Sequence, residues 1–141
     1  MKLSRTSSYA LQAVLQLARS DASGAPIPCS RLAADGKMPE RFLLQILRSL
    51  VTHGILGSTR GVVGGYCLER NPEEISVLDI IEAVDGPVVP MLPMHEGLSE
   101  EANNKLKCAF ANLTELARQE LAAIKLSHLL PLADRSELAA G

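Results

Sequence analysis

Aromatic residues are scarce in this sequence and tryptophan is absent: aromatic side chains are 3% of the 141 residues, whereas 47% are hydrophobic. The core must therefore be aliphatic, and the length suits one domain with an extension. No apolar run approaches the roughly 20 residues that a membrane-spanning helix needs. The first residues, Met1 to Arg5, lack the apolar segment of a signal peptide. We therefore expect a cytoplasmic protein.

Cysteine is also scarce. The three cysteines, Cys29, Cys67 and Cys108, lie far apart in the sequence and form no C-x-x-C pair. In a reducing compartment we expect them to be thiols rather than disulfides. The sequence also lacks a plausible Ser/His/Asp arrangement and paired carboxylates on a pocket-forming scaffold. We therefore expect no catalytic residues and no enzyme activity.

Charge is distributed unevenly along the chain, although the net charge is only −2. Residues 1–70 hold nine Lys/Arg and four Asp/Glu, a net +5, and residues 71–141 hold five Lys/Arg and twelve Asp/Glu, a net −7. A basic half suits a polyanion such as DNA, and an acidic half does not. The N-terminal half is therefore the candidate nucleic-acid-binding part.

What the sequence does contain is a strongly patterned stretch from Arg41 to Leu68. Its first half predicts an amphipathic helix, because apolar residues recur at i, i+3, i+4 and i+7: Leu43, Ile46, Leu47 and Leu50. Pro39 suits the helix start and Gly54 suits its C-cap. The second half predicts a hairpin, in which β-prone residues 55–56 and 66–68 flank a glycine-rich loop that carries Arg60.

A helix followed by a glycine-rich, arginine-bearing hairpin is typical of a winged helix-turn-helix. In that fold the helix enters the DNA major groove, and the hairpin tip, or wing, reaches the narrow and negative minor groove. Residues 7–19 and about 30–35 predict two preceding helices, the second stopped by Gly36. Ser76 and Asp79 predict a capping box for a helix at about 77–84, which Gly86 ends. The expected fold is mainly α, with a small β-hairpin wing.

The C-terminal part predicts one long helix from Ser99 to Lys125, about 40 Å in length at 1.5 Å per residue. Its apolar residues form a stripe along one side: Leu106, Phe110, Leu113, Ala117, Leu121 and Ile124. One small domain cannot cover such a stripe, so we expect a two-fold homodimer through this helix rather than a helix that folds back on its own domain. The expected organisation is a DNA-binding domain at 1–86, a Pro/Met-rich loop at 87–98, a dimerisation helix and short turn at 99–132, and a flexible tail at 133–141.

Short motifs spread along the chain carry a family resemblance: Lys2-Leu3-Ser4, Tyr9-Ala10-Leu11, Phe42-Leu43, Gln45-Ile46-Leu47, Gly54-Ile55-Leu56, Ser58, Arg60-Gly61, Gly64-Gly65-Tyr66-Cys67-Leu68 and the run from Asp79 to Pro87. On these motifs, over about residues 1–130, the chain resembles the Rrf-two family of bacterial transcription regulators, the group that includes IscR, NsrR and CymR. The motif from Gly54 to Leu68 is the most specific of them.

The resemblance implies a homodimer with the long helix as its interface, Arg60 in the minor groove, and base-edge readers around Arg41 and Gln45. These residue types suit the task, since Arg can fork onto guanine and Gln onto adenine. Where many members have an acid before the glutamine, this chain has Leu44. An apolar side chain can meet a thymine methyl but cannot accept from cytosine, so we expect a different target sequence.

Many members of the family bind an iron-sulfur cluster through three closely spaced cysteines before the long helix, and here only Cys108 stands near such a place. A cluster needs several thiolates or imidazoles together, so we expect no cofactor. His95 and Cys108, with Met91 and Met94 nearby, are candidate copper or zinc ligands. Methionine in a Pro-rich loop is more often a filler of an apolar surface, so we expect no metal site.

We therefore expect a sequence-specific DNA-binding transcription regulator, acting as a repressor and as a homodimer on a palindromic site. We expect eight residues to contact DNA, at its phosphates, its bases or its minor groove: Lys2, Arg5, Arg31, Lys37, Arg41, Gln45, Arg48 and Arg60. Two alternatives stay open: a winged-helix protein-interaction module without DNA binding, and a sensor that responds to thiol chemistry or metal. An unknown effector or protein partner is compatible with each of them.

Overall fold

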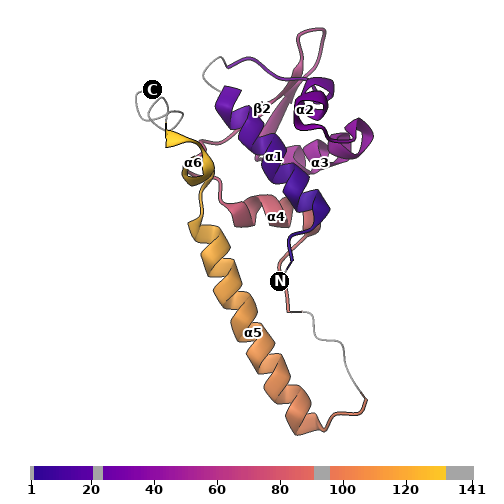
Figure 1. Cartoon of the computed structure of the whole chain (residues 1–141), viewed down its shortest axis with the longest axis vertical. Coiled ribbons are helices and arrows are strands. Elements are labelled where there is room, and N and C mark those ends of the chain that lie inside the picture. Colours follow the sequence, from indigo (N-terminus) through magenta and orange to yellow (C-terminus); the bar gives the residue numbers. More distant parts are fainter. Residues whose placement is uncertain (1, 21–23, 91–95, 133–141) are drawn as a thin grey trace.

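The computed structural model describes residues 2–20, 24–90 and 96–132 (Figure 1). Its elements in chain order are α1 (Arg5–Ser20), α2 (Cys29–Gly36), α3 (Glu40–Thr52), β1 (Leu56–Thr59), β2 (Gly65–Leu68), α4 (Val77–Asp85), α5 (Glu100–Ala123) and α6 (Leu126–Leu129). Six helices and one two-stranded antiparallel hairpin in the described ranges make the protein a mainly helical winged helix, which confirms the predicted fold class.

The core lies between α1, α3 and α4, and its buried residues are aliphatic. The apolar stripe predicted for α3 is buried in full: Leu43, Ile46, Leu47 and Leu50 are at most 2% exposed. Leu17 of α1 and Ile80 of α4 belong to the same cluster. The aromatic rings contribute at its edge, where Tyr9 and Phe42 meet in a T-shaped contact with ring centroids 5.8 Å apart. One polar face of α3 is therefore left for contacts outside the protein.

The turn between α2 and α3 differs from the sequence prediction. Gly36 was expected to stop the helix, but it is the last residue of α2, and Lys37 takes the left-handed conformation at φ +53°. A Cβ at Gly36 would lie 2.5 Å from the Met38 Cε and 2.9 Å from the Gln12 Nε2, so the flexible ends of these two side chains would have to shift. The Gln12 amide also donates to the Gly36 carbonyl at 2.9 Å. Glycine thus permits a close approach of α1 to α2 and does not itself make the turn.

The wing is a hairpin in which Leu56 pairs with Leu68 and Thr59 pairs with Gly65. The first strand starts one residue later than predicted and runs through the polar residues up to Thr59, because the partner strand offers pairing across that whole length. Ile27 adds a bridge to Tyr66, with the two N–H···O bonds at 2.9 and 2.8 Å. Tyr66 pairs with Ser58, one pair from the wing loop, so this bridge holds the loop end of the hairpin ladder against the segment that leads into α2.

The capping box predicted for α4 is present. The Asp79 N–H donates to the Ser76 Oγ at 3.0 Å, and the Ser76 N–H donates to the Asp79 Oδ2 at 2.9 Å. The other end of α4 is bound to α1, because the hydroxyls of Ser4 and Ser7 both donate to the Asp85 carboxylate. The first turn of α4 is therefore stabilised by its own cap, and its last residue is held against the start of α1.

Helix α5 extends away from the other helices over most of its length (Figure 1). It begins one residue after Ser99, whose Oγ accepts from the Ala102 N–H at 3.1 Å, and it ends two residues before the predicted Lys125. At its C-terminal end the Val77 N–H donates to the Ile124 carbonyl at 2.9 Å, and the buried Leu126 of α6 joins the core. Within the described residues, no helix is long and apolar enough to cross a membrane.

Candidate nucleic-acid interface

The face of α3 opposite its buried stripe carries three polar residues at helical spacing. Arg41, Gln45 and Arg48 are exposed and lie four and three residues apart, so they share one side of the helix. Leu44, which departs from the family pattern, is half-buried beside them. The sequence prediction that α3 has one apolar and one polar face is thus confirmed, and the polar face carries both arginines.

A concavity of about 530 Å³ lies between the C-terminal half of α3 and the wing. Its lining brings Arg48 of α3 and Arg60 of the wing to one place, although they are far apart in the sequence. The remaining lining residues are mostly hydroxyl-bearing or small: Val51, Thr52, Ser58, Thr59, Gly65 and Tyr66. Two guanidinium groups with hydroxyl neighbours make a site that suits a phosphate of a nucleic-acid backbone.

Sequence reasoning missed four of these polar residues: Thr52, Ser58, Thr59 and Tyr66. The Thr52 hydroxyl already donates to the Arg48 carbonyl at 2.9 Å, so its oxygen rather than its proton faces any further partner. A signal existed for Ser58 and Thr59, because consecutive hydroxyl residues immediately before Arg60 mark a polar strand edge. Nothing in the sequence linked them to Arg48, since only folding brings the helix and the hairpin together.

A second, separate concavity of about 600 Å³ is lined by the N-terminal segment. It contains the exposed Lys2 and Arg5 together with Leu3, Ser4, Ser8 and Tyr9. Lys2 and Arg5 do not line the concavity between α3 and the wing. The predicted phosphate-contacting residues therefore fall in at least two groups on the described surface.

The other two predicted phosphate contacts are Arg31, in the first turn of α2, and Lys37, in the turn between α2 and α3. The Arg31 Nε lies 3.7 Å from the Asp35 Oδ2 in an exposed ion pair, and Lys37 is exposed at its left-handed position. Neither residue lines the concavity that holds Arg48 and Arg60. An exposed ion pair of this kind contributes little to stability, so Arg31 can exchange Asp35 for another anion at small cost.

The three cysteines occupy three different environments. Cys29 is half-buried at the first position of α2, and desolvation by burial, then the Glu40 carboxylate, raises the pKa of its thiol. Cys67 is half-buried in the wing, with its Sγ 3.9 Å from the Gly57 carbonyl oxygen. Cys108 is exposed on α5. A thiol whose pKa is raised is a poor nucleophile and a poor metal ligand at neutral pH, which argues against a reactive role for Cys29.

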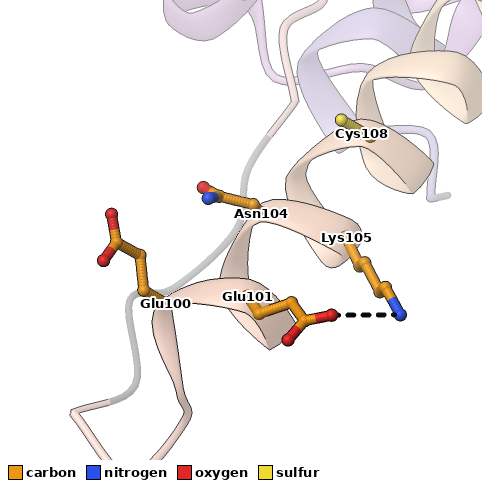
Figure 2. A pocket seen from close by; sticks show the side chains of 5 residues that line it. All are labelled: Glu100, Glu101, Asn104, Lys105 and Cys108. Atoms are coloured by element: carbon orange, nitrogen blue, oxygen red, sulfur yellow. Dashed lines mark ion pairs between the residues drawn. The ribbon is translucent and has the colours of Figure 1, made fainter.

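Cys108 lines a shallow depression of about 570 Å³ with Glu100, Glu101, Asn104 and Lys105 (Figure 2). The Lys105 ammonium lies 3.7 Å from the Glu101 carboxylate, and the side chain points toward Glu101 and away from the Cys108 thiol (Figure 2). His95, the other candidate metal ligand, lies outside the described residues together with Met91 and Met94. Across residues 2–20, 24–90 and 96–132, no group of three or more His, Cys, Asp or Glu side chains is placed to hold a metal ion.

The predicted interface stripe lies on α5, which has no buried residue. Leu106 and Phe110 are 38% and 39% exposed, and Leu113 is 60% exposed. Leu116, which the sequence prediction left out, is 59% exposed on the same helix. The remaining stripe residues are half-buried nearer the core: Ala117, Leu121 and Ile124. The stripe is therefore uncovered mainly where α5 projects beyond the other helices.

Known proteins resemble this chain in family, sequence and structure. A family model described as "Rrf2: Iron-dependent Transcriptional regulator" matches residues 3–131. A candidate HTH-type transcriptional regulator of Mycobacterium tuberculosis is 41% identical over 88 residues, which is 62% of this chain and 54% of the relative. The HTH-type transcriptional regulator CymR of Bacillus subtilis is 33% identical over 91 residues, 64% of this chain and 65% of the relative.

Solved structures of similar proteins extend the match over more of the chain. The structure of CymR, named as the global cysteine regulator of B. subtilis, gives a TM-score of 0.73 at 26% identity and covers 92% of this chain and 95% of that one. IscR of T. potens gives 0.72 at 26% identity, with 100% and 94% covered. In the sequence comparison, the chain spans from just over half to about two thirds of the length of the first curated relatives it matches.

Proposed function

This chain belongs to the Rrf2 family of transcriptional regulators, and we propose that it is a sequence-specific repressor that binds a palindromic DNA site as a homodimer. The observation that carries the proposal is the concavity in which α3 and the wing bring Arg48 and Arg60 together beside exposed hydroxyl groups. A helix and a hairpin that flank one cationic concavity match the way a winged helix straddles a DNA backbone. As a DNA-binding protein it would act in the cytoplasm, where bacterial DNA lies.

Sequence choice in this proposal rests on Arg41 and Gln45. Both are exposed on the polar face of α3, and both residue types can make two hydrogen bonds to one base in the major groove, Arg to guanine and Gln to adenine. Half-buried Leu44 lies between them in sequence and offers an apolar contact to a thymine methyl. Arg60, at the start of the wing loop, is assigned to the minor groove, whose negative potential attracts a guanidinium.

Affinity in this proposal comes mainly from phosphate contacts. Arg48 lines the concavity between α3 and the wing and would contact a backbone phosphate there, and Lys2 and Arg5 lie in a second cationic group on the N-terminal segment. Arg31 in the first turn of α2 and Lys37 in the α2–α3 turn would be further phosphate contacts, Arg31 by exchanging its exposed partner Asp35. Each such contact releases counterions from DNA, so binding should weaken steeply with salt.

The homodimer is supported by the exposed apolar stripe of α5. Leu106, Phe110, Leu113 and Leu116 retain 38–60% of their exposure on a helix with no buried residue. A second copy of the same helix covers such a stripe with a self-complementary surface, which is how a two-fold interface works. Two DNA-binding domains related by a two-fold axis read a palindrome, and a dimer seated on a promoter excludes polymerase, which is the basis for proposing repression.

We also propose that the protein works without an iron-sulfur cluster. The basis is the donor set: the sequence has three cysteines, of which Cys29 and Cys67 lie in the winged-helix part and Cys108 stands alone on α5. A cluster needs several thiolates or imidazoles gathered at one point, and this donor set does not fit that need. Iron and acid-labile sulfide measured after anaerobic purification test the proposal, and a stoichiometric content of both would overturn it.

The experiment that tests DNA binding is selection of binding sites from a random duplex pool by the full-length protein, followed by footprinting of the selected site and of the promoter of its own gene. We expect a two-fold symmetric protected stretch. The Arg60→Ala variant should lose specific affinity and reduce the slope of log affinity against log salt by about one. Arg19→Ala, an exposed arginine in the last turn of α1, is the matched control and should bind like the wild type.

Failure of that selection would have a clear meaning. If no sequence is enriched and binding to duplex DNA shows no salt dependence, the protein is not a DNA-binding regulator and the interaction-module alternative gains. If sites are enriched but Arg60→Ala binds them as well as the wild type does, DNA binding stands and the minor-groove assignment of Arg60 is wrong.

A further inference from the structure

The tip of the wing carries an exposed apolar pair whose role is not explained by folding. Val62 is fully exposed at 106% and Val63 is 84% exposed, more than any other large hydrophobic residue of the described chain. Exposing two adjacent valine side chains to water is unfavourable in free energy. The stretch between the two strands could have been polar without loss of pairing, because neither valine takes part in the ladder.

The backbone holds these two side chains outward in a defined turn. The Gly64 N–H donates to the Gly61 carbonyl at 3.1 Å, so Val62 and Val63 are the two central residues of a four-residue turn. Gly61 has φ +113°, and a Cβ at Gly64 would clash with the Thr59 carbonyl oxygen, so both flanking positions require glycine.

Valine is an unexpected residue at such positions. Turn centres favour Gly, Pro, Asn, Asp and Ser, whereas β-branched residues favour strands. Val62 and Val63 also have stiff χ1 angles, so they form a rigid apolar tip that loses little side-chain entropy on contact with a partner. An unfavourable residue choice at a rigid, exposed tip indicates selection for binding rather than for stability.

The partner is indicated by the neighbouring charge and by the position of the tip. Arg60 immediately precedes the turn and lines the concavity that it shares with Arg48 of α3. The wing loop and the free end of α5 lie at opposite ends of the long axis of the molecule (Figure 1). A second copy packed on α5 would therefore leave the tip uncovered, and the tip directly follows Arg60, which lines the concavity that is proposed to face DNA.

We infer that Val62 and Val63 enter the DNA minor groove beside Arg60 and pack against the deoxyribose walls of that groove. The inference rests on the proposed DNA-binding function and adds to it a contact that is apolar rather than ionic. Minor-groove walls present the C–H groups of the sugars, and proteins that use this groove commonly combine a guanidinium with inserted apolar side chains. The valines would thus make affinity depend on the width of the groove next to the arginine.

The test uses the site selected by the wild-type protein and the full-length Val62→Ser, Val63→Ser double variant. We expect about a tenfold loss of affinity for two partly buried valines, with the slope of log affinity against log salt unchanged, because no ion is released by an apolar contact. Hydroxyl-radical footprinting, which reports the accessibility of deoxyribose, should lose its protection in the minor groove under the wing and keep it elsewhere.

Three controls separate this result from others. Val89→Ser makes the same chemical change at an exposed position outside the wing (60% exposed) and should change neither affinity nor footprint. Val62→Ile, Val63→Ile keeps the tip apolar and should retain most of the affinity. The urea midpoint should be unchanged in every variant, since the substituted side chains are exposed.

The inference fails if the serine variant binds with wild-type affinity and footprint, because the two valines would then make no contact with DNA. It also fails if affinity falls together with the salt slope, because the loss would then be due to displaced Arg60. These outcomes differ from failure of the proposed function, in which the wild-type protein selects no site.

Discussion

Replacing Leu113 by alanine tests whether α5 forms the dimer interface, because Leu113 is the most exposed residue of the predicted apolar stripe. Full burial of a leucine side chain is worth about 1.5–3 kcal/mol, and Leu113 is 60% exposed, so the burial still available at an interface is about 1–2 kcal/mol per protomer. In a two-fold dimer the substitution occurs twice. The expected loss is therefore about 2–4 kcal/mol, or roughly a 30- to 1,000-fold rise in the dimer dissociation constant.

The assay is sedimentation equilibrium over a range of protein concentrations, which gives the dissociation constant directly. Val62→Ala is the matched control, because it also removes an exposed apolar side chain but lies at the wing, far from α5. The control should keep the wild-type dissociation constant. If Leu113→Ala also keeps it, or if the wild type is monomeric at every concentration, the argument that a second copy covers α5 is refuted.

Three further perturbations follow from the described contacts. Ser76→Ala removes the hydroxyl that accepts from the Asp79 N–H at 3.0 Å and should cost about 1 kcal/mol in urea unfolding, with an unchanged m-value; a wild-type midpoint would show that this cap contributes nothing. Gly65→Ala would place a Cβ against the backbone of Ile27, so the free energy of unfolding should fall by roughly 1–3 kcal/mol and the melting temperature should fall with it. A wild-type melting temperature would contradict that contact. Burial, then Glu40, raises the pKa of the Cys29 thiol, so iodoacetamide at neutral pH should alkylate this thiol more slowly in the folded protein than in urea. The stability that the protonated Cys29 thiol contributes should be lost as the pH rises above the ordinary thiol pKa. Equal alkylation rates, measured by peptide mass spectrometry, would argue against the raised pKa.

Much of the fold could be predicted because its signals are local. The spacing of Leu43, Ile46, Leu47 and Leu50 sets one buried face of α3, and folding buried all four. The capping box of Ser76 and Asp79 is also local, since both partners lie within one helical turn. A pattern that spans only a few residues depends little on the rest of the fold, and for that reason the predicted bounds of α3 and α4 lie close to the observed ones.

Misassignments arose where a residue responds to a distant part of the chain. Gly36 looked like a helix stop, but its lack of a side chain makes room for Gln12 and Met38, and Lys37 adopts the positive φ instead. Leu116 falls off the spacing of the predicted stripe and is 59% exposed on the same helix, and the membership of the stripe stays a prediction. Helical periodicity gives the direction of a side chain but not the width of the surface that its neighbours leave open.

The sequence by itself determined the family, the winged helix and the types of residue available for contact with DNA. Periodicity, turn chemistry and motifs each depend on residues that lie close together in the sequence. Only the tertiary structure decided which of those residues act at one place. Arg48 lies on α3 and Arg60 lies in the wing, and these two elements meet where Leu50 of α3 and Leu56 of β1 join the same core cluster. Lys2 and Arg5 form a separate group for the same reason. Distances between segments depend on long-range packing, which no local pattern encodes.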